Sequence, residues 1–178
     1  MSAVLETQHP DGAETLDERI CEHLVARGRL KEADLARARR LLDEGNDSNL
    51  VPLLTRLGLV SEREMGESLA EVLGLQLLSA KECPEMPPPN VQMSVRFLKQ
   101  YHVVPIAETE TGVTLLMADP AETYPLQALG LATGTVIEPN VGLPSEIDDL
   151  IERYYGQGRS ALGAIVDPEH LQMIRRFA

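Results

Sequence analysis

The chain is short, acidic and poor in aromatic residues. It has 178 residues, with 16 Lys and Arg against 28 Asp and Glu, so its formal net charge is −12. This length suits one domain or two small ones, and an apolar content of 43% is normal for a globular protein. Binding to nucleic acid or to anionic lipid draws on Lys and Arg, so the charge argues against nonspecific binding to either.

Cysteine content and hydropathy favour a cytoplasmic protein. Cys21 and Cys83 are too few and too far apart in the sequence for a disulfide framework or a zinc site. The first residues lack the apolar core of a signal peptide, and no apolar run is long enough to span a membrane. Any membrane contact would therefore come only through a protein partner.

The first part of the chain has a helical pattern. After a polar tail over residues 1–15, apolar residues recur at helical spacing over residues 16–73 and predict four short helices. Gly28 is placed to end the first helix. Ser61, followed three residues later by Glu64, predicts a capping box at the start of the fourth.

A shift of 30 residues superimposes the two halves of this helical part. Each half contains a helix, a glycine, an apolar residue, an acidic helix start and a second helix. Neither half alone could bury its apolar face, so two stacked copies predict a small helical bundle. The matching pairs are Asp17 and Asp47, Ile20 and Leu50, Leu24 and Leu54, Gly28 and Gly58, Leu30 and Val60, Glu32 and Glu62, and Leu35 and Met65.

After Gly74, short apolar runs alternate with helical segments. The residues around Gly112 predict a hairpin turn, Ser94 a helix cap, and Pro144 the start of the most regular helix. The predicted strands cover 75–78, 103–106, 113–117 and 136–137, and the predicted helices cover 94–101, 126–132 and 144–155. This order predicts a small α/β sandwich with a three- or four-stranded sheet.

Together these elements predict an α+β fold, in which an all-helical bundle of two tandem repeats precedes the α/β sandwich. We expect a helical partner-docking subdomain over 16–73 and an α/β subdomain over 74–157. A linker with a short terminal helix is expected over 158–178.

Motifs of common enzyme classes are missing from the sequence. It has no GxxxxGK[ST] phosphate loop and no GxGxxG, GxSxG or HExxH motif. The four histidines are scattered, and the carboxylates of Asp148, Asp149 and Glu152 belong to a predicted helix whose dipole favours acids near its start. We predict no catalytic residue and no metal site.

Basic residues gather in the first repeat, whereas residues 100–152 contain nine acids and no Lys or Arg. A solvated helix face is the simplest interpretation of such a run. Because Arg donates bidentate hydrogen bonds to carboxylates, a docking surface for an acidic partner is the functional interpretation, and a nucleotide phosphate is a third. The candidate partner-binding residues are Arg27, Arg29, Arg37 and Arg40.

Five stretches resemble the N-terminal region of type II secretion system ATPases, which are related to the MshEN domain of pilus assembly ATPases. They occur in the family's order and span about residues 16–166. The stretches are LVARGRLKEADLARARRLL, LLTRLGLVSEREMGESLAEVLGL, SVRFLKQYHVVPI, LLMADP and GLPSEIDDLIERYYGQGRSALGAIV.

The resemblance implies an N-terminal module that precedes a hexameric ATPase core. In that family the helical part docks onto the cytoplasmic domain of an inner-membrane platform protein, and the docked motor drives secretion. The chain would then be an adaptor, cytoplasmic and peripheral to the bacterial inner membrane. No cofactor is expected in this chain, because ATP and Mg would belong to an attached motor domain.

A related form of the helical module binds cyclic di-GMP through two RLGxxL units, each with a later Gly and a terminal Gln. Aligned on Gly28 and Gly58, this chain keeps Arg19 but lacks the second Arg, both motif glycines and both Gln residues. Arg56 precedes Gly58 in a different register. We expect that the scaffold is kept and the nucleotide site is lost; the alternative is a cyclic di-GMP sensor that uses Arg19, Gly28 and Gly58.

Overall fold

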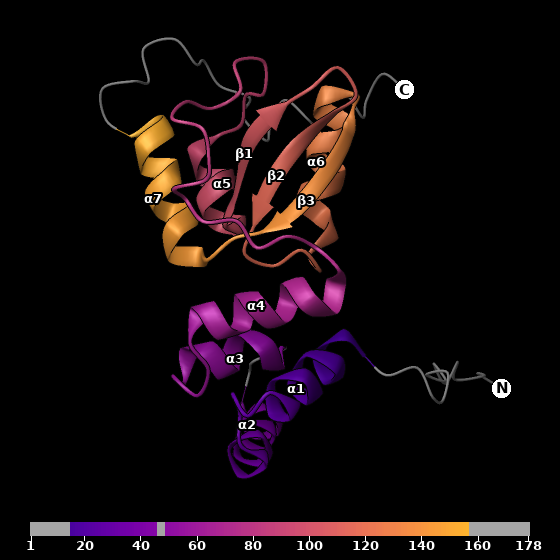
Figure 1. Ribbon diagram of the computed structural model, residues 1–178, viewed down its shortest axis with the longest axis vertical. Helices are drawn as coiled ribbons and strands as arrows, with labels where there is room; N and C mark the ends of the chain where they lie inside the picture. The colour runs from indigo at the N-terminus through magenta and orange to yellow at the C-terminus, as the bar shows by residue number, and fades with distance from the viewer. Residues whose placement is uncertain (1–14, 46–48, 157–178) are drawn as a thin grey trace, which may run out of the picture. The chain divides into compact units, whose positions relative to one another are not determined.

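The computed structural model describes residues 15–45 and 49–156, which form seven helices and three strands (Figure 1). By its internal contacts the chain divides into a first unit that ends at Val60 and a second that begins at Ser61. The predicted tail up to residue 14 and the predicted linker and helix over 158–178 lie outside the described residues.

Three helices make up the described part of the first unit, and a carboxylate accepts a backbone hydrogen bond at two of their starts. Thr15 and Glu18 form a capping box, in which the Thr15 N–H donates to Glu18 Oε2 at 2.9 Å. The Leu50 N–H, at the start of the third helix, donates to Asp17 Oδ2 at 3.3 Å. The helices are α1 (Leu16–Ala26), α2 (Glu32–Glu44) and α3 (Leu50–Arg56).

The 30-residue repeat is confirmed by the turns that follow α1 and α3. Gly28 and Gly58 both have φ of 68°, in the left-handed region that favours glycine. Their N–H groups donate to the carbonyls three residues earlier at 2.9 and 3.0 Å, and the next N–H groups to the carbonyls five residues earlier at 2.8 and 3.0 Å. Leu30 and Val60 are then buried, so each turn returns an apolar side chain to the interior.

The second unit begins with α4 (Glu62–Leu73), which starts at the predicted capping box of Ser61 and Glu64. The sequence pattern groups this helix with the three before it, but its contacts group it with the sheet. Ser145 Oγ donates to Glu62 Oε2 at 2.6 Å, and Gly66 is so close to Leu143 that a Cβ would lie 2.8 Å from Leu143 Cδ2.

The sheet has the strand order β1-β2-β3, with β1 (Val103–Glu108), β2 (Gly112–Met117) and β3 (Val136–Val141). β1 and β2 form the predicted antiparallel hairpin, and β3 pairs with β2 in parallel. The register between β2 and β3 runs from Gly112 opposite Val136 to Met117 opposite Val141. The fold is therefore α+β with a three-stranded mixed sheet.

The predicted strand over 75–78 is wrong as a full strand. Only an isolated bridge forms there, between Leu77 and Val141. The left-handed Gly74, with φ of 67°, ends α4 just before the segment, and a turn closed by the hydrogen bond from the Glu82 N–H to the Ser79 carbonyl follows it. The short segment between them makes a single parallel bridge, so the sheet stops at three strands.

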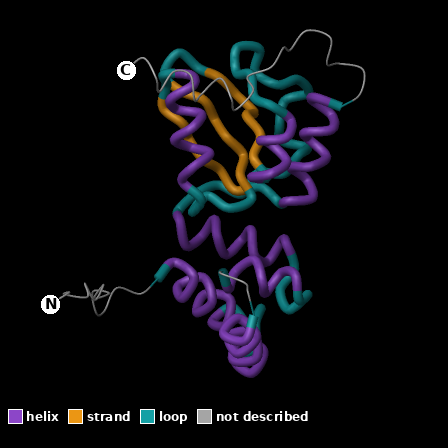
Figure 2. Tube along the Cα trace, turned by 180° about the vertical axis from the view of Figure 1, so that it is seen from behind, coloured by secondary structure: helices purple, strands orange, loops and turns teal. Residues whose placement is uncertain are grey.

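Three helices pack against the sheet: α5 (Val95–Tyr101), α6 (Thr123–Thr133) and α7 (Pro144–Tyr155). α5 and α7 contact each other and β1, whereas α6 contacts β3. Seen from behind, the strands are visible between α6 on one side and α5 with α7 on the other (Figure 2). The buried core of this unit includes Leu98, Leu115, Leu116, Met117, Leu129, Ile147 and Ile151.

Candidate functional site

The outward face of α2 carries two of the predicted partner-binding residues. Leu35 and Ala38 define the buried face of this helix. Arg37 and Arg40, three residues apart, are exposed and lie on the opposite face. Their guanidinium groups are thus placed to meet a ligand from solvent.

The other two predicted residues, Arg27 and Arg29, flank Gly28 in the turn between α1 and α2, and both are exposed. Arg27 is the C-cap of α1, where the helix dipole favours a cation. At a rise of about 1.5 Å per residue, the turn at Lys31 lies roughly 9 Å along the axis from Arg37. The four predicted arginines therefore come from two segments, the turn around Gly28 and the exposed face of α2.

The charge of Arg39 on α2 affects the pKa of two groups on α1, Cys21 and Glu18. Burial raises the pKa of the Cys21 thiol to about 11, and the charge of Arg39 only partly opposes this effect. Hydrogen bonds from Thr15 lower the pKa of Glu18, with a smaller effect in the same direction from Arg39. The thiol stays protonated at neutral pH, so this part of the unit offers no reactive nucleophile.

The residues of the alternative nucleotide site are accounted for by local structure. Arg19 lies on the exposed face of α1. At Gly28 and at Gly58 an added Cβ would meet no atom within 4 Å, so space does not require glycine at either position. The positive φ does require it. The structure thus agrees with the prediction that Gly28 ends the first helix, and Gly58 shapes the equivalent turn.

The acidic helix α7 uses its carboxylates for contacts within the second unit. Asp148 Oδ1 lies 3.3 Å from His102 Nδ1, and Glu152 pairs with Lys99. The pairing with Glu152 raises the pKa of Lys99. These carboxylates therefore link α7 to α5 and to the residue after it, in addition to any effect on the helix dipole. Within residues 15–45 and 49–156, no group of three His, Cys, Asp or Glu could hold a metal ion.

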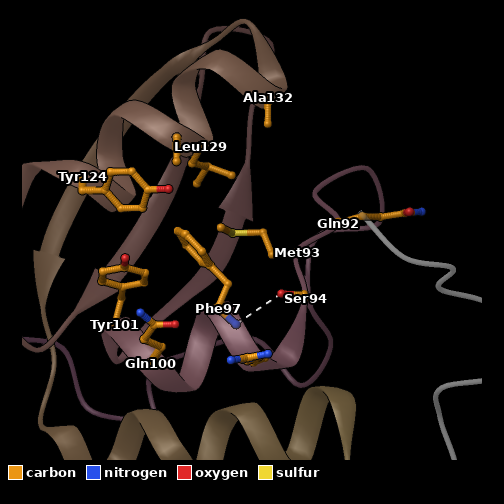
Figure 3. A pocket seen from close by; sticks show the side chains of 11 residues that line it. Gln92, Met93, Ser94, Phe97, Gln100, Tyr101, Tyr124, Leu129 and Ala132 are labelled. Carbon is orange, nitrogen blue, oxygen red and sulfur yellow. Dashed lines mark hydrogen bonds between the residues drawn. The ribbon is translucent and has the colours of Figure 1, made fainter. Parts of the chain in front are cut away.

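A hollow between α5 and α6 is a feature that the sequence pattern had not flagged. Its volume is about 270 Å³, and its walls carry three aromatic rings (Figure 3). A signal was available in the sequence, because Met93, Phe97 and Tyr101 repeat every four residues. The predicted helix over 94–101 had been given no role beyond its place in the fold. Figure 3 shows these side chains gathered beneath Tyr124 of α6.

Comparison with known proteins identifies the family. The model of the MshEN domain matches residues 73–161. The chain belongs to the MshEN domain family. The matched segment holds the sheet and its three helices but none of the basic residues of α1 and α2.

Curated relatives of this MshEN domain chain include a type II secretion system protein and type IV pilus assembly ATPases. It is 53% identical over 153 residues to the type II secretion system protein E of Xanthomonas campestris pv. campestris, covering 84% of this chain and 27% of that protein. It is 24% identical over 149 residues to the type IV pilus assembly ATPase PilB of Myxococcus xanthus, covering 83% and 26%. The chain thus spans about a quarter of the length of these relatives.

Solved structures agree with this assignment. The N-terminal domain of XpsE is 48% identical to this MshEN domain chain, with a TM-score of 0.72 over 82% of this chain and 99% of that one. A structure of MshE with cdg has a TM-score of 0.64 at 22% identity and covers 77% and 99%, which shows a shared fold. None of the described helices is long and apolar enough to cross a membrane.

Proposed function

We propose that this chain is the N-terminal adaptor module of a type II secretion ATPase. The observation that carries the proposal is the outward pair Arg37 and Arg40 on α2, joined to 53% identity with a type II secretion protein E. A pair of exposed guanidiniums is suited to carboxylates on a partner surface. The partner would be the cytoplasmic domain of an inner-membrane platform protein of the secretion system.

In this proposal, the module recognises the partner, and the rest of a full-length protein hydrolyses ATP. The matched region is about a quarter of the type II secretion protein E. ATP hydrolysis, Mg²⁺ binding and a hexameric core would belong to the remaining part. The module would stay in the cytoplasm at the inner membrane, held there by its partner, and its own residues would supply recognition.

Binding to the partner's purified cytoplasmic domain tests this proposal. We expect the double variant Arg37→Glu and Arg40→Glu to bind at least about tenfold more weakly, because reversed charges repel an acidic surface. The matched control is Arg63→Glu with Lys81→Glu, which makes the same charge change at exposed positions of the second unit. Circular dichroism checks that each variant is folded. Equal affinity of the two double variants would exclude the basic face of α2 as the surface that binds the partner.

A cyclic di-GMP sensor is the second candidate, favoured by the shared fold of the structure of MshE with cdg. Against it stand the missing motif residues around Gly28 and Gly58 and the structural reason for these glycines. We expect calorimetry with cyclic di-GMP to give no binding heat. Micromolar or tighter binding that is lost in Arg19→Ala would establish the sensor instead.

A further inference from the structure

The hollow between α5 and α6 exists because large and small side chains face each other across it. Met93, just before α5, and Phe97 supply bulk on one wall. Ala128 and Ala132 of α6 lie on the other, separated by one helical turn. Alanine leaves the space that a larger side chain would fill at these two positions. Tyr124, one turn before Ala128, closes one end of the hollow (Figure 3).

The closed end is an aromatic cluster. The ring centroids of Phe97 and Tyr101 are 4.8 Å apart, those of Tyr101 and Tyr124 are 5.3 Å apart, and those of Phe97 and Tyr124 are 6.2 Å apart. The chain has only six aromatic residues, so this cluster holds half of them. Aromatic rings contribute large contact areas with little conformational entropy to lose, and they are enriched where proteins recognise one another.

The apolar surface continues beyond the hollow. Tyr124, at the edge of the hollow, is 51% exposed, and Leu131, on the same helix and outside the lining, is 85% exposed. No residue from Thr123 to Thr133 is charged, although the surrounding stretch of sequence is strongly acidic. An exposed apolar patch of this kind marks an interaction surface. A hollow of about 270 Å³ suits an inserted side chain of a larger partner better than a drug-sized ligand.

The charge at the rim indicates which partner fits. Among the described residues that line the hollow, Arg96 is the one that carries a charge. It is exposed and forms no ion pair with any residue of the described chain, whereas Lys99, on the next turn, is paired with Glu152. The two other long polar side chains in the wall, Gln92 and Gln100, are neutral. A carboxylate brought to this rim would meet an available guanidinium and no acid among the described lining residues.

From these observations we propose that the hollow receives a segment of a protein partner that inserts a bulky apolar side chain and places a carboxylate against Arg96. Phe97, Tyr101 and Tyr124 contact the inserted side chain, and Ala128 and Ala132 give it room. This surface lies on the second unit. The proposal therefore stands apart from the docking role proposed for Arg37 and Arg40, and either can fail alone.

Two blocked dipeptides test the chemistry on the full-length chain. N-acetyl-Phe-Glu-amide and N-acetyl-Phe-Lys-amide carry the same apolar group and opposite charges. In titrations followed by protein amide NMR shifts, we expect the Glu peptide to perturb residues of α5 and α6. We also expect it to bind about threefold more tightly than the Lys peptide, as for an exposed ion pair. Shifts confined to other parts of the chain, or no shifts, would overturn the proposal.

Variants assign the binding to the hollow. Ala128→Leu fills the space and should abolish binding of both peptides, while Gln127→Leu adds the same side chain at the exposed neighbouring position and should keep it. Arg96→Gln should remove the preference for the Glu peptide, and Lys81→Gln should leave that preference intact. Unchanged binding by Ala128→Leu, with the amide spectrum showing a folded protein, would refute the insertion.

Discussion

At the scale of single residues, the two turn glycines separate a structural role from a binding role. Gly28 and Gly58 have φ of 68°, and a side chain there would meet no neighbour. We expect Gly28→Ala and Gly58→Ala each to lower the free energy of unfolding by about 1 kcal/mol, because a Cβ strains the left-handed conformation. Urea denaturation measures the change. Gly28→Asn should cost less than Gly28→Ala, since Asn tolerates this region better.

The same substitution at Gly130 is the matched control. This glycine lies inside α6, and an added Cβ would come no closer than 3.7 Å to a neighbour, Ile137 Cγ1 or the Thr135 carbonyl. Gly130→Ala should therefore stabilise the protein, by up to about 1 kcal/mol, through the higher helix propensity of alanine. Destabilisation of equal size at Gly28 and at Gly130 would show that backbone conformation is not the deciding factor.

At the scale of helices, the internal repeat contains its own comparison of capping. α4 starts at Ser61, whose hydroxyl accepts from the Glu64 N–H at 3.2 Å, whereas the equivalent start of α2, at Lys31, has no side-chain cap. We expect Ser61→Ala to cost about 1 kcal/mol and Lys31→Ser to gain a similar amount, because a serine there could accept from the Asp34 N–H. Thermal or urea denaturation measures both. A loss of stability in Lys31→Ser would show that the two repeat starts are not equivalent.

Local patterns predicted most of the helices and strands. The hairpin around Gly112, the cap at Ser94 and the helix from Pro144 all depend on residues close in sequence, and the structure confirms them. The segment 75–78 was predicted wrongly as a full strand, because its apolar run is typical of one. Its flanking turns, and not its composition, limit it to one bridge at Leu77.

Features that depend on distant packing were not predictable from the pattern. The spacing of α4 shows an amphipathic helix, but only the contacts of Gly66 and Glu62 show that it packs with the sheet unit. The hollow likewise depends on two helices more than twenty residues apart in sequence, and its space lies beside two alanines of one of them. Ala128 and Ala132 have no functional group that a sequence pattern would single out, so the space beside them is seen only in the structure.

At the scale of the whole molecule, the net charge of −12 combines two unlike surfaces. The first unit presents Arg37 and Arg40 on the outward face of α2, and the second presents Arg96 beside an uncharged helix in an otherwise acidic stretch. Both proposed surfaces therefore use arginine to select carboxylates, while the remaining acids repel anions elsewhere on the chain. An acidic partner would be attracted by these exposed arginines, although the chain as a whole has a net negative charge like the partner's.

Each unit also contains a buried acidic group whose titration weakens the fold in alkali. Burial raises the pKa of the Cys21 thiol from 9.0 to about 11 and that of the Tyr155 phenol from 10.0 to about 12. In each case the folded state keeps a proton that the unfolded state has lost. The stability that protonated Cys21 contributes is thus complete below its unfolded pKa and is lost as pH rises toward its folded pKa. The contribution of Tyr155 is lost about one pH unit higher.

Denaturant unfolding at about pH 8 and about pH 11 measures this loss, and comparison of variants assigns it. The fall in unfolding free energy should be smaller by about 2 kcal/mol in Cys21→Ala than in the unchanged protein, because alanine has no proton to lose. Tyr155→Phe should also make the fall in unfolding free energy smaller, in a pH range about one unit higher than for Cys21→Ala. Any cavity left by Cys21→Ala lowers stability equally at both pH values, so only the difference between them counts. The same fall in Cys21→Ala as in the unchanged chain would show that the thiol is not protected from ionisation in the folded first unit.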